Sequence, residues 1–214
     1  MPAPAAQQTP LRSDRLDQRV CLHDIAWADY EALLAARGDQ PGVRVTYLEG
    51  ELELMTPSVH HESLKTRLAR LLEAYAEAAG IPLEGFGSWT LKSQSERRGA
   101  EADECYVIGP IATLPEMPDI AIEVVWTRGG IDKLEVYRGL GVREVWIWQD
   151  GTLRFYLLQE GAYLAGTRSG LLPDLDPGLI ARCMDAPSQT QALKLLRAAL
   201  RGLPLRGSEG DPGA

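Results

Sequence analysis

The sequence predicts one domain of the α/β or α+β class, in which helices flank a mixed β-sheet. Its 214 residues are 45% hydrophobic and 24% charged, which is enough apolar side chain for one complete core. Several segments alternate apolar and polar residues in the manner of strands, and two longer ones repeat apolar residues with helical periodicity. These segments are interleaved along residues 21–203, which we therefore expect to form a single domain.

The N-terminal part predicts a tail, a short helix and a hairpin. Residues 1–20 are rich in Pro, Ala and Gln without periodicity, so we expect a flexible tail. The stretch "WADYEALLAARGD" has a short helical pattern that stops at Gly38. In "VRVTYLEGELELM", residues 43–55, two alternating runs flank Glu49-Gly50, which predicts a β-hairpin.

The most regular helical pattern follows this hairpin. Residues 60–80 place five apolar side chains on one face and end at Gly80, which predicts a long helix. The five are Leu64, Leu68, Leu71, Leu72 and Tyr75. After this helix, strands are expected in "SWTLKS", "ECYVI" and "IAIEVVW".

The C-terminal half adds a second helix and a meander. "IDKLEVYRGLG" predicts a helix from Ile131 to a stop at Gly141. "REVWIWQDGTLRFYLLQEGAYLAG" predicts three strands joined by an Asp-Gly and a Glu-Gly turn. A last helix is expected at 189–201, and the Gly- and Pro-rich residues 204–214 are expected to be a disordered tail.

Composition narrows the class of protein. No apolar stretch approaches the roughly 18 residues of a membrane span, and the N-terminus has no apolar signal core, so a cytoplasmic protein is expected. Three widely spaced cysteines in no CxxC pattern indicate reduced thiols. The net charge is −8 and the pI is near 5.0. A polyanion would therefore have to be met by a local patch or through metal ions.

Glu123 is the single charged side chain in the apolar run "IAIEVVW". A carboxylate inside a sheet is costly unless a cation, a metal or hydrogen bonds compensate it. Alternation places Ala121, Glu123 and Val125 on one face of the strand. Asp119 is in phase with Glu123, but four residues span about 13 Å, too far for two ligands of one ion. We expect Asp119 only to precede the strand.

A partner carboxylate for Glu123 is expected on a neighbouring strand, about 4.8 Å away. In "GAEADECYVIG", Asp103 begins a strand-like run, and Glu101 lies two residues earlier in the same phase. Asp103 and Glu123 on adjacent strands would form a divalent-cation site with room for water and a substrate phosphate. Lys133, in the first turn of the next helix, can fold back toward the strand end.

Each of these three residues also has a structural interpretation. Glu123 could pair with an arginine such as Arg98 or Arg128. Asp103 could be a turn residue, since Asp is common where strands begin. Lys133 could be an ordinary surface lysine.

Other candidates are weaker. His61 is expected to cap or pack at the start of the long helix, because no HExxH pattern or third ligand accompanies the neighbouring His60 and Glu62. Glu101 could be a third metal ligand, although a solvated position is expected. The aromatic residues that alternate in the meander predict sheet core or a dimer surface rather than base stacking. They are Trp146, Trp148 and Phe155.

Four blocks of the sequence together resemble a known family. They are "YLEGELELMTPSVHHESL", "AEADECYVIG", "PDIAIEVVWT" and "DKLEVYRGLGVREVWIW". Over about residues 47–163 they are similar to the Uma-two-type restriction-endonuclease family of the PD-(D/E)XK nuclease superfamily. The resemblance implies a restriction-endonuclease-like mixed sheet flanked by helices. It also implies phosphodiester hydrolysis that depends on Mg²⁺ or Mn²⁺.

The resemblance also assigns residues. The motif aspartate falls on Asp103, the strand glutamate on Glu123, a displaced lysine on Lys133, and the histidine before the long helix on His61. The implied catalytic residues are Asp103, Glu123 and Lys133, and the implied metal ligands are Asp103 and Glu123. In this scheme Arg128 could contact a neighbouring phosphate.

Three positions depart from the family pattern. Ala102 stands where a proline usually precedes the aspartate, and Val125 occupies the usual lysine position of the superfamily. The segment "WTRGG" replaces a Ser- and Thr-rich loop after the glutamate.

Two functions of different classes remain open. One is a magnesium-dependent endonuclease acting on DNA. The alternative is a catalytically inactive nuclease-fold module that binds or regulates within a mobile-element or defence system. The retained Asp103, Glu123 and Lys133 favour the first, whereas the acidic charge and Val125 favour the second. DNA is the expected partner, bound weakly without metal, and no membrane partner is expected. A homodimer is compatible with the fold, since many such nucleases dimerise to cut both strands.

Overall fold

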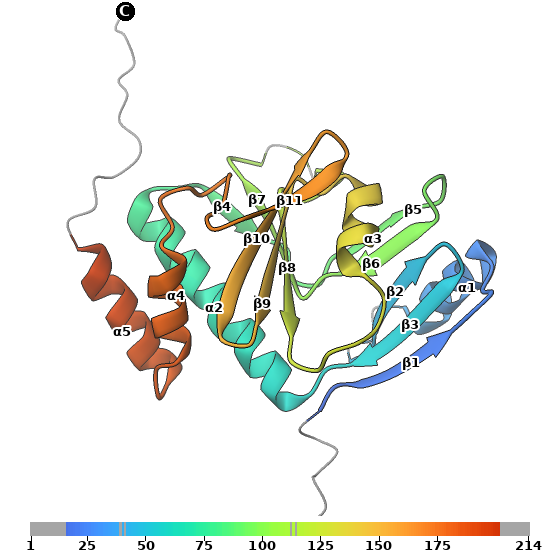
Figure 1. Ribbon diagram of the computed structural model, residues 1–214, viewed down its shortest axis with the longest axis horizontal. Helices are drawn as coiled ribbons and strands as arrows, with labels where there is room; N and C mark the ends of the chain where they lie inside the picture. The colour runs from blue at the N-terminus through green and yellow to red at the C-terminus, as the bar shows by residue number, and fades with distance from the viewer. Residues whose placement is uncertain (1–15, 39, 41, 112, 114, 202–214) are drawn as a thin grey trace, which may run out of the picture.

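The computed structural model describes residues 16–38, 40, 42–111, 113 and 115–201, which form five helices and eleven strands (Figure 1). The helices are α1 (Trp27–Arg37), α2 (Val59–Ala79), α3 (Lys133–Leu140), α4 (Pro177–Met184) and α5 (Gln189–Leu200). The strands are β1 (Gln18–Leu22), β2 (Arg44–Leu48), β3 (Glu51–Thr56), β4 (Leu83–Gly85), β5 (Thr90–Ser93), β6 (Arg98–Glu101), β7 (Glu104–Ile108), β8 (Ile120–Val125), β9 (Glu144–Gln149), β10 (Thr152–Gln159) and β11 (Ala162–Gly166).

The strands form two sheets. An antiparallel sheet has the order β1-β3-β2-β6-β5, and a six-stranded sheet has the order β11-β10-β9-β8-β7-β4. The second sheet is mixed, because β8 and β9 run parallel while its other pairs are antiparallel. The expected restriction-endonuclease-like α+β architecture, a mixed sheet with flanking helices and a C-terminal meander, is confirmed.

The strands are divided between two sheets, of which only one is mixed, and the division has a local cause. Only Ala102 and Asp103 separate β6 from β7, yet β6 pairs with β2 and β5 while β7 pairs with β4 and β8. The chain changes sheet at these two residues without a glycine or proline to mark the change. A run of residues that looks like one continuous strand therefore belongs to two sheets.

Helices cover both faces of the six-stranded sheet. On one face α2, α4 and α5 pack over Ile120, Ile122 and Val124 of β8, and on the other α3 packs over Ala121 (Figure 1). The predicted alternation of β8 is therefore confirmed. The aromatic residues of the meander lie in the core on the α2 side, as the first alternative expected: Trp146, Trp148 and Phe155.

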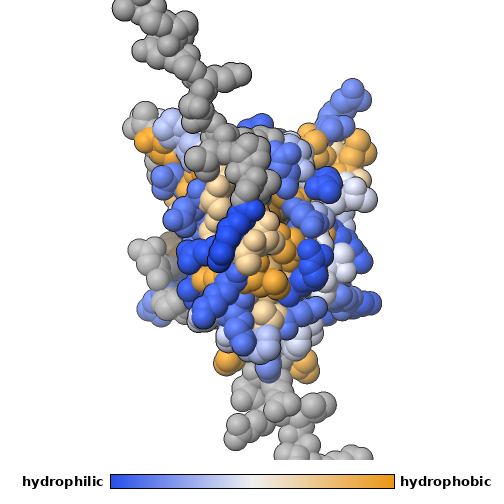
Figure 2. All heavy atoms as spheres, turned by 90° about the vertical axis from the view of Figure 1, so that its left-hand side faces the viewer, coloured by the Kyte–Doolittle hydropathy of each residue, from blue (hydrophilic) through white to orange (hydrophobic). Residues whose placement is uncertain are grey.

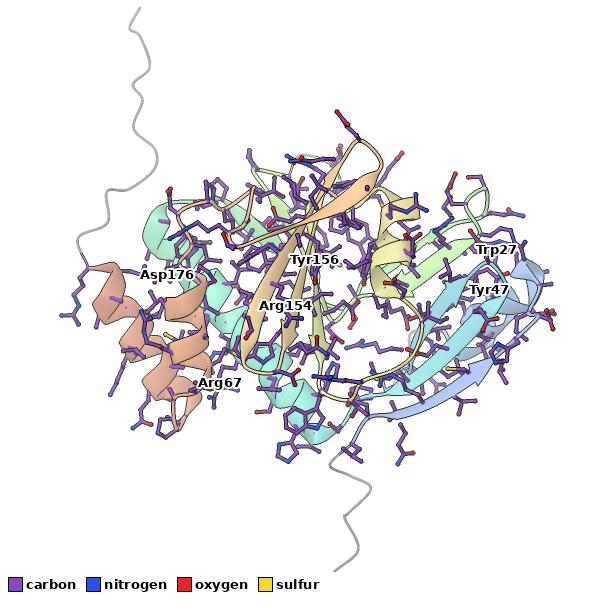
Figure 3. The ribbon with its side chains drawn as sticks, in the orientation of Figure 1. Trp27, Tyr47, Arg67, Arg154, Tyr156 and Asp176 are labelled. Atoms are coloured by element: carbon purple, nitrogen blue, oxygen red, sulfur yellow. The ribbon has the colours of Figure 1, made fainter. Side chains whose placement is uncertain are left out.

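Smaller contacts hold the outer elements in place. Nη1 of Arg67 on α2 donates to the carbonyl oxygens of Met184 and Ala186, at 2.5 and 2.7 Å, which fixes the end of α4 (Figure 3). Tyr47 of the five-stranded sheet stacks on Tyr30 of α1 with ring centroids 4.9 Å apart, and Trp27 packs against both rings. Figure 3 labels Trp27 and Tyr47.

The C-terminal helices present an amphipathic surface. The helix α5 buries Ala192, Leu196 and Leu200 and leaves Leu195 exposed. Figure 2 views this side of the molecule, where hydrophobic atoms lie among hydrophilic ones. Within the described part of the chain, no helix combines the length and the apolar character needed to span a membrane.

The local predictions for hairpin, helices and meander are confirmed. The hairpin turns at Glu49 and Gly50, which both have positive φ, and α2 and α3 end at Gly80 and Gly141 in the left-handed conformation. The predicted tail at 1–20 was too long, because β1 begins at Gln18. Nearly all side chains of β1 are exposed, so the strand has no apolar alternation to detect. Residues 1–15 and the predicted tail at 204–214 lie outside the described residues.

Replacing Gly99 on β6 should destabilise the fold. An ideal Cβ at this position would lie 2.1 Å from the hydroxyl oxygen of Tyr30, which is fully buried. Gly99→Ala should therefore lower the free energy of unfolding by about 1–3 kcal/mol, measured by urea denaturation. The same change in a Tyr30→Leu background should cost less, because the obstructing ring is gone. Equal costs in both backgrounds would contradict this account.

Candidate active site

Glu123 lies on β8 and faces α3. Its Oε1 accepts hydrogen bonds from Nζ of Lys133, at 3.3 Å, and from the hydroxyl of Tyr137. Lys133 is the first residue of α3, and Asp132 caps this helix by accepting the backbone N–H groups of Leu134 and Glu135. The loop between β8 and α3 thus brings Lys133 back to the strand, as its position in the sequence predicts. Neither of the two arginines considered as partners pairs with Glu123.

Those arginines have other partners. Arg128 is exposed and pairs with Asp150, while Arg98 lies 3.0 Å from a carboxylate oxygen of Glu49. The interpretation that Glu123 pairs with an arginine was therefore wrong, because the cation that compensates its charge is Lys133.

Asp103 lies opposite Glu123, at the point where the chain passes between the sheets. The antiparallel register pairs Glu104 with Ile122, so one further step sets Asp103 beside Glu123. Oδ2 of Asp103 accepts the backbone N–H of Val124 at 2.8 Å. The predicted placement of the two carboxylates on adjacent chain segments is therefore observed. Their catalytic role stays a prediction.

His61 occupies the space beside Asp103. Its Nε2 lies 2.9 Å from Oδ1 of Asp103, although neither atom has a hydrogen-bond partner with good geometry. Its Nδ1 lies 3.4 Å from Oδ2 of Asp17, and its backbone N–H donates to Oγ of Ser58, the N-cap of α2. His61 is thus a packed residue of the helix start, as expected, and a contact of the candidate site as well.

Asp17 is the residue that fixes His61 from the other side. Its buried carboxylate accepts the backbone N–H groups of Ser58, at 2.9 Å, and Thr127, at 3.3 Å. These two residues precede α2 and follow β8. One carboxylate of the N-terminal segment therefore joins both chain segments that carry the site.

The two central carboxylates have pKa values shifted in opposite directions. Burial raises the pKa of Glu123, and the charge of Asp103 raises it further, while Lys133 and Tyr137 oppose the shift. Burial also acts to raise the pKa of Asp103, but His61, the N–H of Val124 and Lys133 outweigh it, so this pKa is lowered. Asp103 is therefore the more firmly ionised member of the pair.

The charge of His61 follows from its two neighbours. Burial lowers the pKa of its imidazole, but Asp103 and Asp17 raise it to about 9. Burial likewise acts against ionised Asp17, and His61 and the N–H of Ser58 reverse this, giving a pKa of about 2. At neutral pH the site thus holds an imidazolium between two carboxylates.

A cavity of about 190 Å³ borders Glu123 and Lys133. Glu53 of β3 forms part of its wall and accepts the backbone N–H of Ile131 at 3.1 Å, while Nε of Arg19 lies 3.8 Å from the other oxygen of Glu53. Asp103 is almost fully buried behind this cavity and does not line it. The open side of the candidate site is therefore formed by Glu123 and Lys133.

The donor set suits a hard divalent cation with few protein ligands. Magnesium is often held by one or two carboxylates and keeps several waters. Glu123 at the cavity and Asp103 behind it, whose Oδ1 lacks an aligned hydrogen bond, supply such a pair. In the part of the chain that the structure describes, no group of three or more His, Cys, Asp or Glu side chains is arranged to hold a metal ion.

Glu101 lies outside this group. It is buried and accepts hydrogen bonds from Arg37, from the N–H of Val45 at 2.9 Å and from the hydroxyl of Thr90 at 2.9 Å. Its expected solvated position was wrong. It lines a second cavity, of about 630 Å³, on the side of Arg37, Arg44 and Lys65. Because β6 and β7 belong to different sheets, the shared phase of Glu101 and Asp103 does not bring them to one site.

Sequence reasoning missed Tyr137, Asp17 and Glu53. Tyr137 follows Lys133 by four residues, so helical spacing could have placed both on the face of α3 that meets β8. Asp17 carries no local signal, since it stands in a segment without periodicity. Glu53 alternates within the hairpin like a solvent-facing residue, and only the packing of the 126–132 loop over β3 buries it.

Asp17 should control the pKa of His61. Because the pKa of about 9 in the folded protein exceeds the ordinary 6.5, protonated His61 stabilises the fold fully below pH 6.5. This contribution is lost as the pH rises through about 9. Asp17→Asn should lower the pKa of His61 by at least about one unit, measured by NMR titration of the imidazole. Glu77→Gln, an exposed change on α2, should leave it unchanged. An equal pKa in Asp17→Asn would refute the pairing.

Comparison with known proteins gives one family match. No curated protein matches the chain. The model of the Uma2 family, described as "Putative restriction endonuclease", matches residues 27–178, which include Asp103, Glu123 and Lys133 but not Asp17. This match covers most of the chain and every strand except β1, and it supports a nuclease function. The chain belongs to the Uma2 restriction-endonuclease family.

Proposed function

We propose that the protein is an endonuclease that hydrolyses DNA phosphodiester bonds with the help of Mg²⁺ or Mn²⁺. The observation that carries this proposal is the meeting of Glu123 and Lys133 at one cavity, with Asp103 opposite Glu123. Carboxylates that can hold a metal ion, with a lysine beside one of them, are groups that metal-assisted phosphodiester hydrolysis can use.

Glu123 and Asp103 would hold the cation. When bound, such a cation supplies polarisation of a phosphodiester oxygen and a bound water of lowered pKa. Glu123 is oriented for this task by the hydroxyl of Tyr137 and by Lys133, which both contact the same oxygen. Its second oxygen would then be the one that binds the cation.

Lys133 would hold the attacking water or balance the charge of the phosphate. Its side chain is mostly buried and lies at the wall of the cavity, so its ammonium group acts in a poorly hydrated setting. Arg128 could contact a neighbouring phosphate, because its pairing with Asp150 is exposed and therefore weak.

The first test is nicking of supercoiled plasmid by the pure protein with Mg²⁺, Mn²⁺ or chelator. Cleavage should depend on the metal and should fall to the chelator level in Glu123→Gln, which keeps the shape of the side chain but removes its charge. The variant should still unfold cooperatively. Equal cleavage by wild type and variant would identify a contaminant and would remove the proposal.

Lys133→Met should lower the cleavage rate on the order of 100-fold, because the charge at the cavity is lost while the aliphatic packing stays. The matched control is Lys92→Met, which removes a lysine of the exposed pair with Glu31. Rates should be compared at saturating metal. If both variants cleave like wild type, Lys133 has no place in the mechanism.

The second candidate is a nuclease-fold module without catalysis. It is favoured by the burial of Asp103, whose oxygens already contact His61 and the N–H of Val124. In such a module these contacts are structural, and Glu123 with Lys133 is a buried ion pair. Absence of cleavage with either metal, together with DNA binding that Glu123→Gln leaves unchanged, would favour this candidate.

A further inference from the structure

Two aromatic rings lie exposed beside the candidate site. Trp126, which follows β8, stacks on His60 in the first turn of α2, with ring centroids 5.4 Å apart and planes 26° from parallel. Trp126 is 44% exposed, whereas the meander tryptophans are buried in the core. Two exposed apolar residues are nearby in sequence: Val59 precedes His60, and Leu16 precedes Asp17. Asp17 accepts the N–H groups of Ser58, before α2, and Thr127, after β8.

Trp126 and His60 are close in sequence to the residues of the candidate site. Trp126 follows Glu123 by three residues, and it stands between Val125 and Gly129, which both line the cavity. His60 directly precedes His61, the contact of Asp103. A ligand with a phosphate at the cavity would therefore have its neighbouring nucleoside within reach of these rings.

Few positive charges around the site are available to bind phosphate. The chain has a net charge of −8. Two arginines beside the site already have carboxylate partners: Arg19 with Glu53, and Arg44 with Glu62 and Asp103. Affinity for a polyanion must then come partly from a source other than charge. Stacking on an aromatic ring is such a source and contributes at every base that is free to stack.

We propose that Trp126, supported by His60, is a stacking platform for an unpaired base of the DNA strand at the site. Bases inside a duplex are already stacked on their neighbours, whereas the bases of a single strand can unstack and offer a ring face along its whole length. The preferred ligand is therefore single-stranded DNA. This inference rests on the proposed function for the position of the phosphate, but its test measures binding and not cleavage.

The test measures fluorescence anisotropy of a labelled oligodeoxythymidylate of about ten nucleotides and of a duplex of equal length. Ca²⁺ replaces Mg²⁺ at low salt, and gels verify that the oligonucleotide stays intact. Trp126→Ala should weaken single-strand binding by about 5- to 100-fold and leave duplex binding nearly unchanged. Trp126→Phe should restore most of the affinity. The control Leu164→Ala changes another exposed apolar residue, on β11, and should have no effect.

A second arm tests the base itself. A single abasic site is placed in turn at each position of the oligonucleotide. At one position it should weaken binding to the wild type, and at that same position it should not weaken binding to Trp126→Ala. Single-strand binding that Trp126→Ala leaves unchanged, a duplex bound more tightly than the single strand, or no binding of the single strand would each overturn the platform. Plasmid cleavage that survives such a result would leave the nuclease standing. Loss of single-strand affinity in Trp126→Ala without any cleavage would keep the platform and reject the nuclease.

Discussion

The buried carboxylate of Asp103 is the constraint on which the arrangement of the two sheets depends. It stands where the chain leaves β6 and enters β7, and a carboxylate removed from water must be given partners by the surrounding structure. Those partners are the N–H of Val124 in one sheet and His61 at the start of α2, which Asp17 holds from the segment before β1. Removal of the charged partner of a buried carboxylate typically costs about 3–5 kcal/mol. The requirement to keep Asp103 satisfied thus fixes both sheets and α2 relative to one another.

The two neighbouring carboxylates of this site have different pKa values because their surroundings differ. Asp103 has a cationic imidazole beside it and is held in its ionised form, whereas Glu123 is buried next to the charge of Asp103 and its pKa is raised. A pair whose pKa values are pushed apart in this way is common where two carboxylates have different tasks. Here Asp103 is the enclosed member, whose contacts also join parts of the fold, and Glu123 is the member at the cavity. Both the nuclease and the non-catalytic module require the structural contacts of Asp103, and only the nuclease requires the two carboxylates to hold a cation.

The features that could be predicted from the sequence are those that depend on residues close together in the chain. The turn at Glu49-Gly50, the end of α2 at Gly80 and the face of β8 that carries Glu123 all follow from local patterns. The helix α4 was missed although Asp176 and Pro177 form a typical helix start. The division into two sheets, the burial of Glu101 against Arg37 and the role of Asp17 depend on contacts between distant segments. No spacing within one segment encodes these contacts, so they could not be predicted.

The loop at 126–132 explains how a lysine can serve Glu123 although Val125 holds the usual lysine position. Asp17 holds the N–H of Thr127, Glu53 holds the N–H of Ile131, and Asp132 caps α3, so the loop is fixed at its beginning, its end and its exit into the helix. At Gly130, with φ of 96°, an ideal Cβ would lie 1.9 Å from a carboxylate oxygen of Glu53, so only glycine permits this close approach. Within the segment "WTRGG", Gly130 is therefore required by backbone geometry. This glycine lets the loop close over β3, so that α3 begins with Lys133 beside Glu123. A lysine from the helix thus stands where a lysine on the strand would otherwise be needed.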